Sequence, residues 1–90
     1  MNIVSNDAKE IDTDFLIYSS DFCPYCVAAE RYLQSHGFSF TIVDLTNNFE
    51  KRKEIILETG HRTVPVIFDV RNNHINFIGG FDNLQESGIV

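Results

Sequence analysis

The chain of 90 residues contains few basic side chains. It has seven Lys and Arg against thirteen Asp and Glu, which gives a net charge of -6 at pH 7. An acidic protein is not drawn to phosphate backbones or to anionic membranes. We therefore expect the protein to bind neither nucleic acid nor membranes.

Long apolar segments are also missing. No apolar run approaches the ~18 residues that indicate a membrane-spanning helix. The first fourteen residues, MNIVSNDAKEIDTD, lack the basic start and apolar centre of a signal peptide. These absences predict a cytoplasmic protein. Thiols stay reduced in that compartment, so a close cysteine pair there is more often catalytic or metal-binding than structural.

Tryptophan is absent, and proline and cysteine occur only twice each. With so little proline, 43% hydrophobic residues and eight Phe, the chain does not have the composition of a disordered protein. Its length suffices for a single core. We expect one domain at residues 15–90, preceded at residues 1–14 by an arm or a short extra element.

Strand and helix signals alternate after residue 14. The apolar segment FLIYS, Phe15–Ser19, predicts a strand that is covered on both faces. From Pro24 the apolar residues recur at helical spacing, and Gly37 predicts the end of that helix. A second strand at residues 38–45 should run parallel to the first, because a helix connects them.

The rest of the chain predicts a helix, a hairpin and a short last helix. In NNFEKRKEIILETG, Asn47 and Glu50 resemble a capping box, and Gly60 resembles a helix stop. VPVIFDV and HINFI are separated only by RNN, which is too short for a parallel crossover, so they predict an antiparallel hairpin. GGFDNLQESG predicts a short helix capped near Asp82. The expected order is β-α-β-α-β-β-α, an α/β fold with a four-stranded mixed sheet and helices on both faces.

Both cysteines stand in CPYC, between the first strand and the first helix. Proline is favoured at the first helical position, so Pro24 makes Cys23 the N-cap residue. There a Cys23 thiolate could accept a hydrogen bond from the backbone of Cys26 and would lie at the positive end of the helix, which lowers its pKa. Cys26 begins the apolar stripe and should point inward, one turn away. Cys23 is therefore the candidate nucleophile and Cys26 the candidate resolving thiol.

Two other interpretations of the cysteine pair carry less weight. A zinc site usually needs four ligands, whereas the chain offers one C-x-x-C and three scattered histidines, His36, His61 and His74. Buried inert cysteines are common, but a C-x-x-C pair directly after a strand and at the start of a helix is not typical of them.

Three segments together resemble the glutaredoxin family. CPYC at residues 23–26 is similar to the dithiol active-site signature of that family, TVP at 63–65 to its Thr-Val-Pro element, and GGFDNL at 79–84 to its Gly-Gly-x-Asp element. They follow one another in the order and approximate spacing of the family, and the resemblance covers residues 15–88. It implies the thioredoxin-like fold.

The resemblance also implies a groove for glutathione. Pro65 would be cis and face the cysteine pair, and the backbone of Val64 would pair with the cysteine part of glutathione as an added strand does. Tyr25, between the cysteines, would border this groove.

The glycine pair and the aspartate of GGFDNL would complete the groove. Without side chains at residues 79 and 80, a peptide can approach the backbone closely. Asp82 would accept the α-ammonium group of glutathione, and free N–H groups at the helix start would hold its α-carboxylate. The expected glutathione-binding residues are Tyr25, Arg62, Thr63, Val64, Pro65, Gly79, Gly80 and Asp82.

One stretch departs from the family pattern. Many members carry a lysine a few residues before the first cysteine, whereas this chain has Ser19, Ser20, Asp21 and Phe22 there. The family lysine bears on the pKa of the first cysteine and on the glycine carboxylate of glutathione. We expect Arg62 to bind that carboxylate. The other available groups are Lys51, Arg52 and His61.

The resemblance implies a glutathione-dependent thiol–disulfide oxidoreductase that reduces protein disulfides and glutathione mixed disulfides through a Cys23–Cys26 dithiol. Glutathione would be the co-substrate, with no metal and no permanently bound cofactor. Expected protein partners are disulfide-containing or glutathionylated proteins, with ribonucleotide reductase as a candidate. We expect a monomer.

Two alternative functions stay open at this point. One is a thioredoxin-like electron donor fed by a flavoprotein reductase, although thioredoxins carry Trp-Cys-Gly-Pro-Cys and this chain has no tryptophan. The other is an iron–sulfur or zinc carrier, although cluster-binding relatives are typically monothiol or lack the proline.

Overall fold

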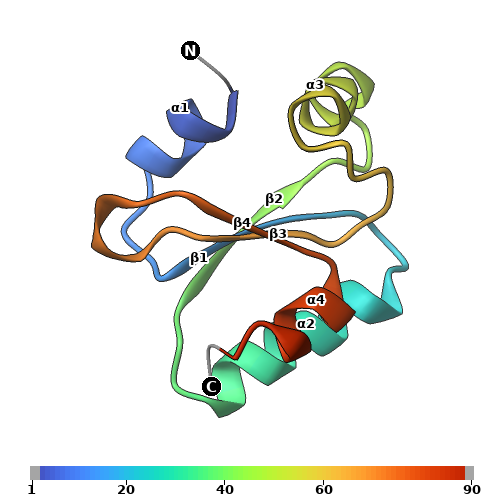
Figure 1. Cartoon of the computed structure of the whole chain (residues 1–90). Coiled ribbons are helices and arrows are strands. Elements are labelled where there is room, and N and C mark those ends of the chain that lie inside the picture. Colours follow the sequence, from blue (N-terminus) through green and yellow to red (C-terminus); the bar gives the residue numbers. More distant parts are fainter. Residues whose placement is uncertain (1–2, 89–90) are drawn as a thin grey trace.

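The computed structural model describes residues 3–88 and contains a four-stranded mixed sheet (Figure 1). β1 spans Phe15–Ser19, β2 Phe40–Asp44, β3 Val66–Asp69 and β4 Asn76–Gly79. The strand order is β2-β1-β3-β4, in which β1 is parallel to β2 and antiparallel to β3, and β3 is antiparallel to β4. The parallel pair and the hairpin are both as the sequence predicted.

Helices cover both faces of this sheet (Figure 1). α1 (Ile3–Lys9) and α3 (Phe49–Thr59) lie on one face, and α2 (Pro24–Ser35) and α4 (Phe81–Glu86) lie on the other. A turn of 3-10 helix, η1 (Arg71–Asn73), connects β3 to β4. Within residues 3–88, none of the helices is long and apolar enough to span a membrane.

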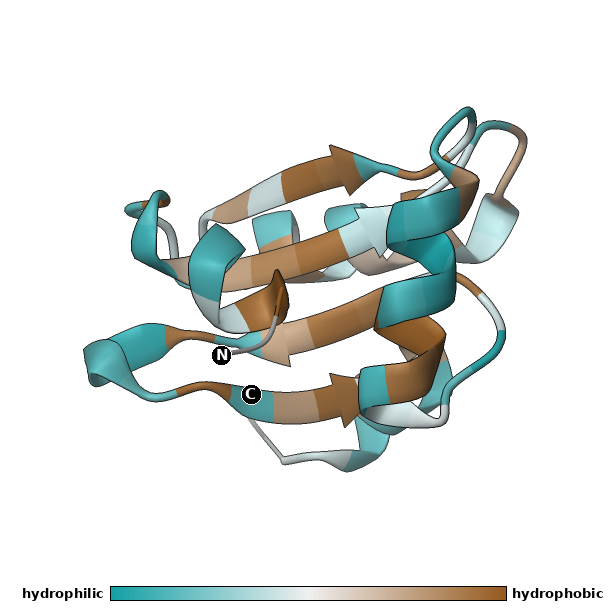
Figure 2. Cartoon of the chain, turned by 90° about the horizontal axis from the view of Figure 1, so that it is seen from above, coloured by the Kyte–Doolittle hydropathy of each residue, from teal (hydrophilic) through white to brown (hydrophobic). Residues whose placement is uncertain are grey.

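The central strand β1 packs against both helical layers. Leu16 and Tyr18 belong to the core beneath α1 and α3, whereas Phe15 and Ile17 belong to the core beneath α2 and α4. Figure 2 shows the apolar residues, in brown, along the strands of the sheet. A strand that is buried on both faces has a continuous apolar sequence, which explains the lack of alternation in FLIYS.

Helix α3 is capped one residue later than the sequence pattern indicated. Asn48, not Asn47, is the N-cap, and its Oδ1 accepts a hydrogen bond from the backbone N–H of Lys51 at 3.1 Å. The two residues are both asparagine, so the type of side chain did not distinguish them. Gly60 ends the helix as predicted, with φ 72° in the left-handed region.

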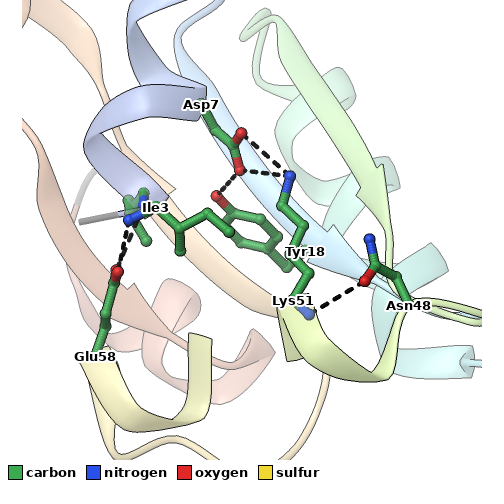
Figure 3. A network of polar contacts seen from close by, with 7 residues as sticks. Ile3, Asp7, Tyr18, Asn48, Lys51 and Glu58 are labelled. Carbon is green, nitrogen blue, oxygen red and sulfur yellow. Dashed lines mark hydrogen bonds and ion pairs between the residues drawn. The ribbon is translucent and has the colours of Figure 1, made fainter. Parts of the chain in front are cut away.

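The segment before β1 forms the short helix α1, which is fastened to β1 and α3 (Figure 3). Asp7 accepts a hydrogen bond from the Tyr18 hydroxyl at 2.5 Å and pairs with Lys51 Nζ at 3.0 Å. Glu58 accepts a hydrogen bond of 2.6 Å from the backbone N–H of Ile3, in the first turn, where helical N–H groups lack helical partners. Burial and the neighbouring Asp7 carboxylate raise the pKa of Tyr18, so its hydroxyl remains a donor.

Candidate active site

Both cysteines lie where β1 leads into α2. Cys23 is the N-cap of α2, with an extended backbone of φ -115° and ψ 96°, and Pro24 follows in the first turn. The backbone N–H of Cys26 donates a hydrogen bond to Cys23 Sγ at 3.1 Å. The predicted N-cap is thus confirmed, and the sulfur lies at the positive end of a helix of 12 residues.

The two sulfur atoms are joined in a disulfide. Cys26 is only 2% exposed, whereas Cys23 is partly exposed. Cys23 is therefore the more accessible residue of the pair.

The segment with the second proline lies against the cysteine pair. The Val64–Pro65 peptide bond is cis, as the family resemblance implied, and the Val64 carbonyl oxygen lies 3.7 Å from Cys23 Sγ. The sheet explains this proximity, because Tyr18 near the end of β1 pairs with Val66 at the start of antiparallel β3. The residues after β1 and the residues before β3 consequently meet at the same end of the sheet.

A groove of about 250 Å³ opens next to Tyr25 and the cis-proline. Most of the expected glutathione-binding residues line it, namely Tyr25, Thr63, Val64, Pro65, Gly80 and Asp82. The rest of its lining is formed by His61, Phe81 and Asn83. Three segments that are distant in the sequence are therefore brought together at the cysteine end of the sheet.

Gly79 lies behind this lining. It is buried, has φ 115°, and a Cβ added there would come within 2.6 Å of Asn83 Oδ1. That same oxygen accepts a hydrogen bond from the backbone N–H of Gly80 at 2.9 Å, at the start of α4. Gly79 therefore makes room for the helix cap, while Gly80 faces the groove.

His61 and Arg62 are neighbours in different surroundings. The His61 ring lines the groove, with Nε2 3.3 Å from Thr63 Oγ1, and packs edge-to-face on Phe77. Arg62 is exposed and borders a second small hollow together with Arg52, and His61 belongs to the lining of this hollow as well. His61 was only one of several groups considered from the sequence, and Arg62 was preferred.

Phe81 and Asn83 were not among the residues expected from the sequence. Asn83 could have been noticed, because it stands three residues after the glycine that precedes α4, where a side chain can cap the backbone. Phe81 packs edge-to-face on Tyr32 of α2, a contact between distant residues that leaves no local signal.

The acidic stretch before Cys23 is tied to the end of β2. The backbone N–H of Asp21 donates to Thr46 Oγ1 at 2.8 Å, and the Thr46 hydroxyl donates to Asp44 Oδ1 at 2.6 Å. The hydrogen bonds from the hydroxyl and the backbone N–H of Thr46 hold the pKa of Asp44 below its usual range. Lys51, one candidate for the role of the family lysine, is instead paired with Asp7 of α1.

The histidines are dispersed, as the sequence suggested. His36 follows the end of α2, His61 lines the groove and His74 follows η1. Across residues 3–88, no group of three or more His, Cys, Asp or Glu side chains comes together in a manner that could hold a metal ion.

The mixed sheet between two helical layers, with C-x-x-C at a helix N-terminus beside a cis-proline, defines a thiol–disulfide oxidoreductase of the thioredoxin-like fold. Within this class the chain belongs to the glutaredoxin family, whose model matches residues 15–75. It is therefore a glutathione-dependent oxidoreductase, with glutathione as its co-substrate.

Comparison with individual proteins gives the same result. Glutaredoxin 3 of Escherichia coli is 43% identical over 68 residues, which are 76% of this chain and 77% of that protein. The solution structure of a dithiolic glutaredoxin from Trypanosoma brucei brucei is similar with a TM-score of 0.75 at 31% identity, over 96% of this chain and 86% of that chain. A buckwheat glutaredoxin in complex with glutathione has the same fold, with a TM-score of 0.79 at 21% identity, over 93% of this chain and 74% of that one.

Proposed function

We propose that Cys23 is the attacking thiol of this oxidoreductase and Cys26 the resolving thiol. The difference between the two sulfur atoms carries the proposal, because Cys23 is partly exposed at the N-cap and Cys26 is 2% exposed. In the reduced enzyme, the backbone N–H of Cys26 and the N-terminus of α2 stabilise a thiolate at Cys23. The thiolate is the nucleophilic form of cysteine.

Reduction of a protein disulfide then takes two exchanges. The Cys23 thiolate attacks one substrate sulfur, the substrate S–S bond breaks, and the departing thiolate takes a proton from water. The Cys26 thiolate next attacks Cys23 Sγ, releases the second substrate thiolate and forms the Cys23–Cys26 disulfide. Two glutathione molecules restore the dithiol and leave as glutathione disulfide, so two electrons pass from glutathione to the substrate.

The groove is the proposed binding site of the glutathione that is joined to Cys23. Its cysteine part would pair with the backbone of Val64, whose carbonyl oxygen is 3.7 Å from Cys23 Sγ. Asp82, exposed in the first turn of α4, would accept the α-ammonium group. Tyr25, Thr63 and Pro65 would form the walls, and Gly80 leaves the backbone open to the peptide.

Two groups are proposed for the glycine carboxylate of glutathione. His61 lines the groove and can donate a hydrogen bond to this carboxylate. Arg62, the residue preferred from the sequence, supplies charge from the exposed segment next to it. Because an exposed charge is screened by solvent, His61 should contribute more of the affinity.

Serine substitutions of the cysteines test the division of roles. Cys23→Ser should abolish glutathione-coupled reduction of every substrate, because the remaining thiol, Cys26, is only 2% exposed. Cys26→Ser should still reduce the mixed disulfide of glutathione with 2-mercaptoethanol, since a second glutathione can release the first, but should lose reduction of intramolecular disulfides. An active Cys23→Ser protein would refute the assignment.

The proposed cellular role follows from the need for reduced glutathione. We infer that the protein acts in the cytoplasm, where the glutathione pool is reducing. Its proposed protein partners are disulfide-containing or glutathionylated proteins, ribonucleotide reductase among the candidates, and it is proposed to act as a monomer.

A further inference from the structure

Phe22, directly before the nucleophile, is fully exposed although it is apolar. Its backbone has φ 54°, in the left-handed region that bulky residues seldom adopt. An exposed ring contributes nothing to the core, so folding does not account for the phenylalanine. Backbone strain of this kind is concentrated at functional sites.

The loop that carries Phe22 is held in place by hydrogen bonds to the end of β2. The backbone N–H of Asp21 donates to the Thr46 hydroxyl at 2.8 Å, and the backbone N–H of Leu45 donates to the Ser19 carbonyl at 2.8 Å. A side chain on a fixed loop loses less conformational entropy on binding than one on a mobile loop. The backbone that carries Phe22 is therefore preorganised.

Phe22 lies outside the lining of the groove. Tyr25, on the other side of Cys23 in the sequence, lines the groove, whereas Phe22 does not belong to that lining among residues 3–88. A partner that covers Phe22 therefore extends beyond the groove. The substrate that fits this requirement is a protein or peptide whose disulfide reaches Cys23.

The surface around Phe22 is acidic. Asp21 and Asp44 are exposed, and the hydrogen bonds from Thr46 keep Asp44 ionised at neutral pH. We call Asp21, Phe22 and Asp44 the outer surface.

The nearest basic side chains belong to α3 and to the segment before β3. Lys51 is paired with Asp7, and Arg52 and Arg62 border a hollow that also includes Leu45, next to Asp44. Asp21 and Asp44, which Thr46 links, supply the negative charge of the outer surface. Groups of opposite charge on a partner would be steered toward it.

We propose that the outer surface docks the protein substrate and selects disulfides that are flanked by basic and apolar side chains. The proposal rests on the function proposed above, since it concerns what Cys23 attacks. Lysine or arginine of the substrate faces Asp21 and Asp44, and an apolar side chain covers Phe22. The exchange steps are those already described.

Two synthetic peptides test the proposal. Each contains one intramolecular disulfide next to a leucine, and the flanking residues are lysines in one peptide and glutamates in the other. Glutathione-coupled reduction is measured at low and high salt, after subtraction of the rate without enzyme. We expect the lysine peptide to be preferred about two- to five-fold in kcat/KM at low salt, with the preference fading at high salt.

Matched variants locate the effect. Asp21→Lys should remove or reverse the preference for the lysine peptide. Asp12→Lys, the same charge change ahead of the opposite end of β1, should preserve this preference. Phe22→Asn should slow both peptides about two- to five-fold, because asparagine tolerates the left-handed backbone but removes the ring. Ile75→Asn, at an exposed position in the β3–β4 hairpin, is its control.

Reduction of the mixed disulfide of glutathione with 2-mercaptoethanol distinguishes an effect on substrate docking from an effect on the exchange reaction. Phe22→Asn, Asp12→Lys and Ile75→Asn should reduce it at the wild-type rate. Asp21→Lys is judged by the ratio of the two peptides alone, because a change in Cys23 reactivity affects both peptides equally. Equal rates for the two peptides at low salt, an unchanged ratio in Asp21→Lys, or an equal loss on the small substrate in Phe22→Asn would overturn the docking proposal. A wild-type protein that is inactive on the small substrate would instead refute the proposed function itself.

Discussion

Individual side chains at the groove have separate tasks even where they are adjacent in the sequence. Gly79 is buried against the Asn83 cap, and Gly80 faces the groove with ordinary space beside the His61 ring. His61 lines the groove and Arg62 does not, although both border the hollow next to α3.

The two candidate ligands of the glycine carboxylate can be distinguished by kinetics. His61→Ala should raise the KM for glutathione about ten-fold, because a hydrogen bond to a charged group is lost from the groove. Arg62→Ala should raise it about two- to five-fold through loss of an exposed charge. His74→Ala, in the hairpin, is the control and should leave the KM unchanged. A larger effect of Arg62→Ala than of His61→Ala would restore the preference derived from the sequence.

At the scale of elements, the β3–β4 hairpin is anchored at its base by Asp69 and Arg71. The Arg71 guanidinium donates to both carboxylate oxygens of Asp69, at 2.9 and 2.8 Å, and lies over the rings of Phe15 and Phe38 at 5.5 and 5.1 Å. The Arg71 hydrogen bonds lower the pKa of Asp69 from its ordinary 3.8. The hairpin is thereby joined to β1 and to the segment that leads into β2.

The lowered pKa of Asp69 predicts a pH dependence of stability. A carboxylate with a depressed folded-state pKa contributes stability that is present above the ordinary 3.8 and is lost as the pH falls through the folded-state value. The free energy of unfolding in urea should therefore fall less between about pH 4 and about pH 2 in Asp69→Asn than in the wild type, by on the order of 1 kcal/mol. Asp12→Asn should behave as the wild type. Identical acid profiles for Asp69→Asn and the wild type would show that the pair has no net effect.

The elements themselves were largely readable from the sequence. FLIYS, the helix from Pro24 and the VPVIFDV–HINFI hairpin follow from local pattern, because burial on two faces and short connections leave direct traces. The cap of α3 was placed one residue early, since adjacent asparagines are equivalent in composition. The docking of α1 by Asp7 and Glu58 could not be predicted, because it depends on partners in β1 and α3 that are distant in the sequence.

At the scale of the whole molecule, the site lies at one end of the sheet, where three strands contribute to it. β1 ends there with the cysteine pair, β3 begins there after the cis-proline, and β4 ends there with Gly79 before α4. The family resemblance supplied the three motifs, and the sheet topology explains why they meet. That His61 lines the groove and that Phe22 does not could be seen only in the folded structure.

We propose that the N-terminus of α2 activates Cys23 as a thiolate without the lysine that many members of the family carry. The direct measurement is the pH dependence of alkylation of the reduced protein, with Cys26→Ser used so that only Cys23 reacts. We predict a midpoint well below the ordinary thiol pKa of about 8.5, because the Cys26 N–H and the helix N-terminus stabilise the anion. A midpoint near 8.5 would contradict this account.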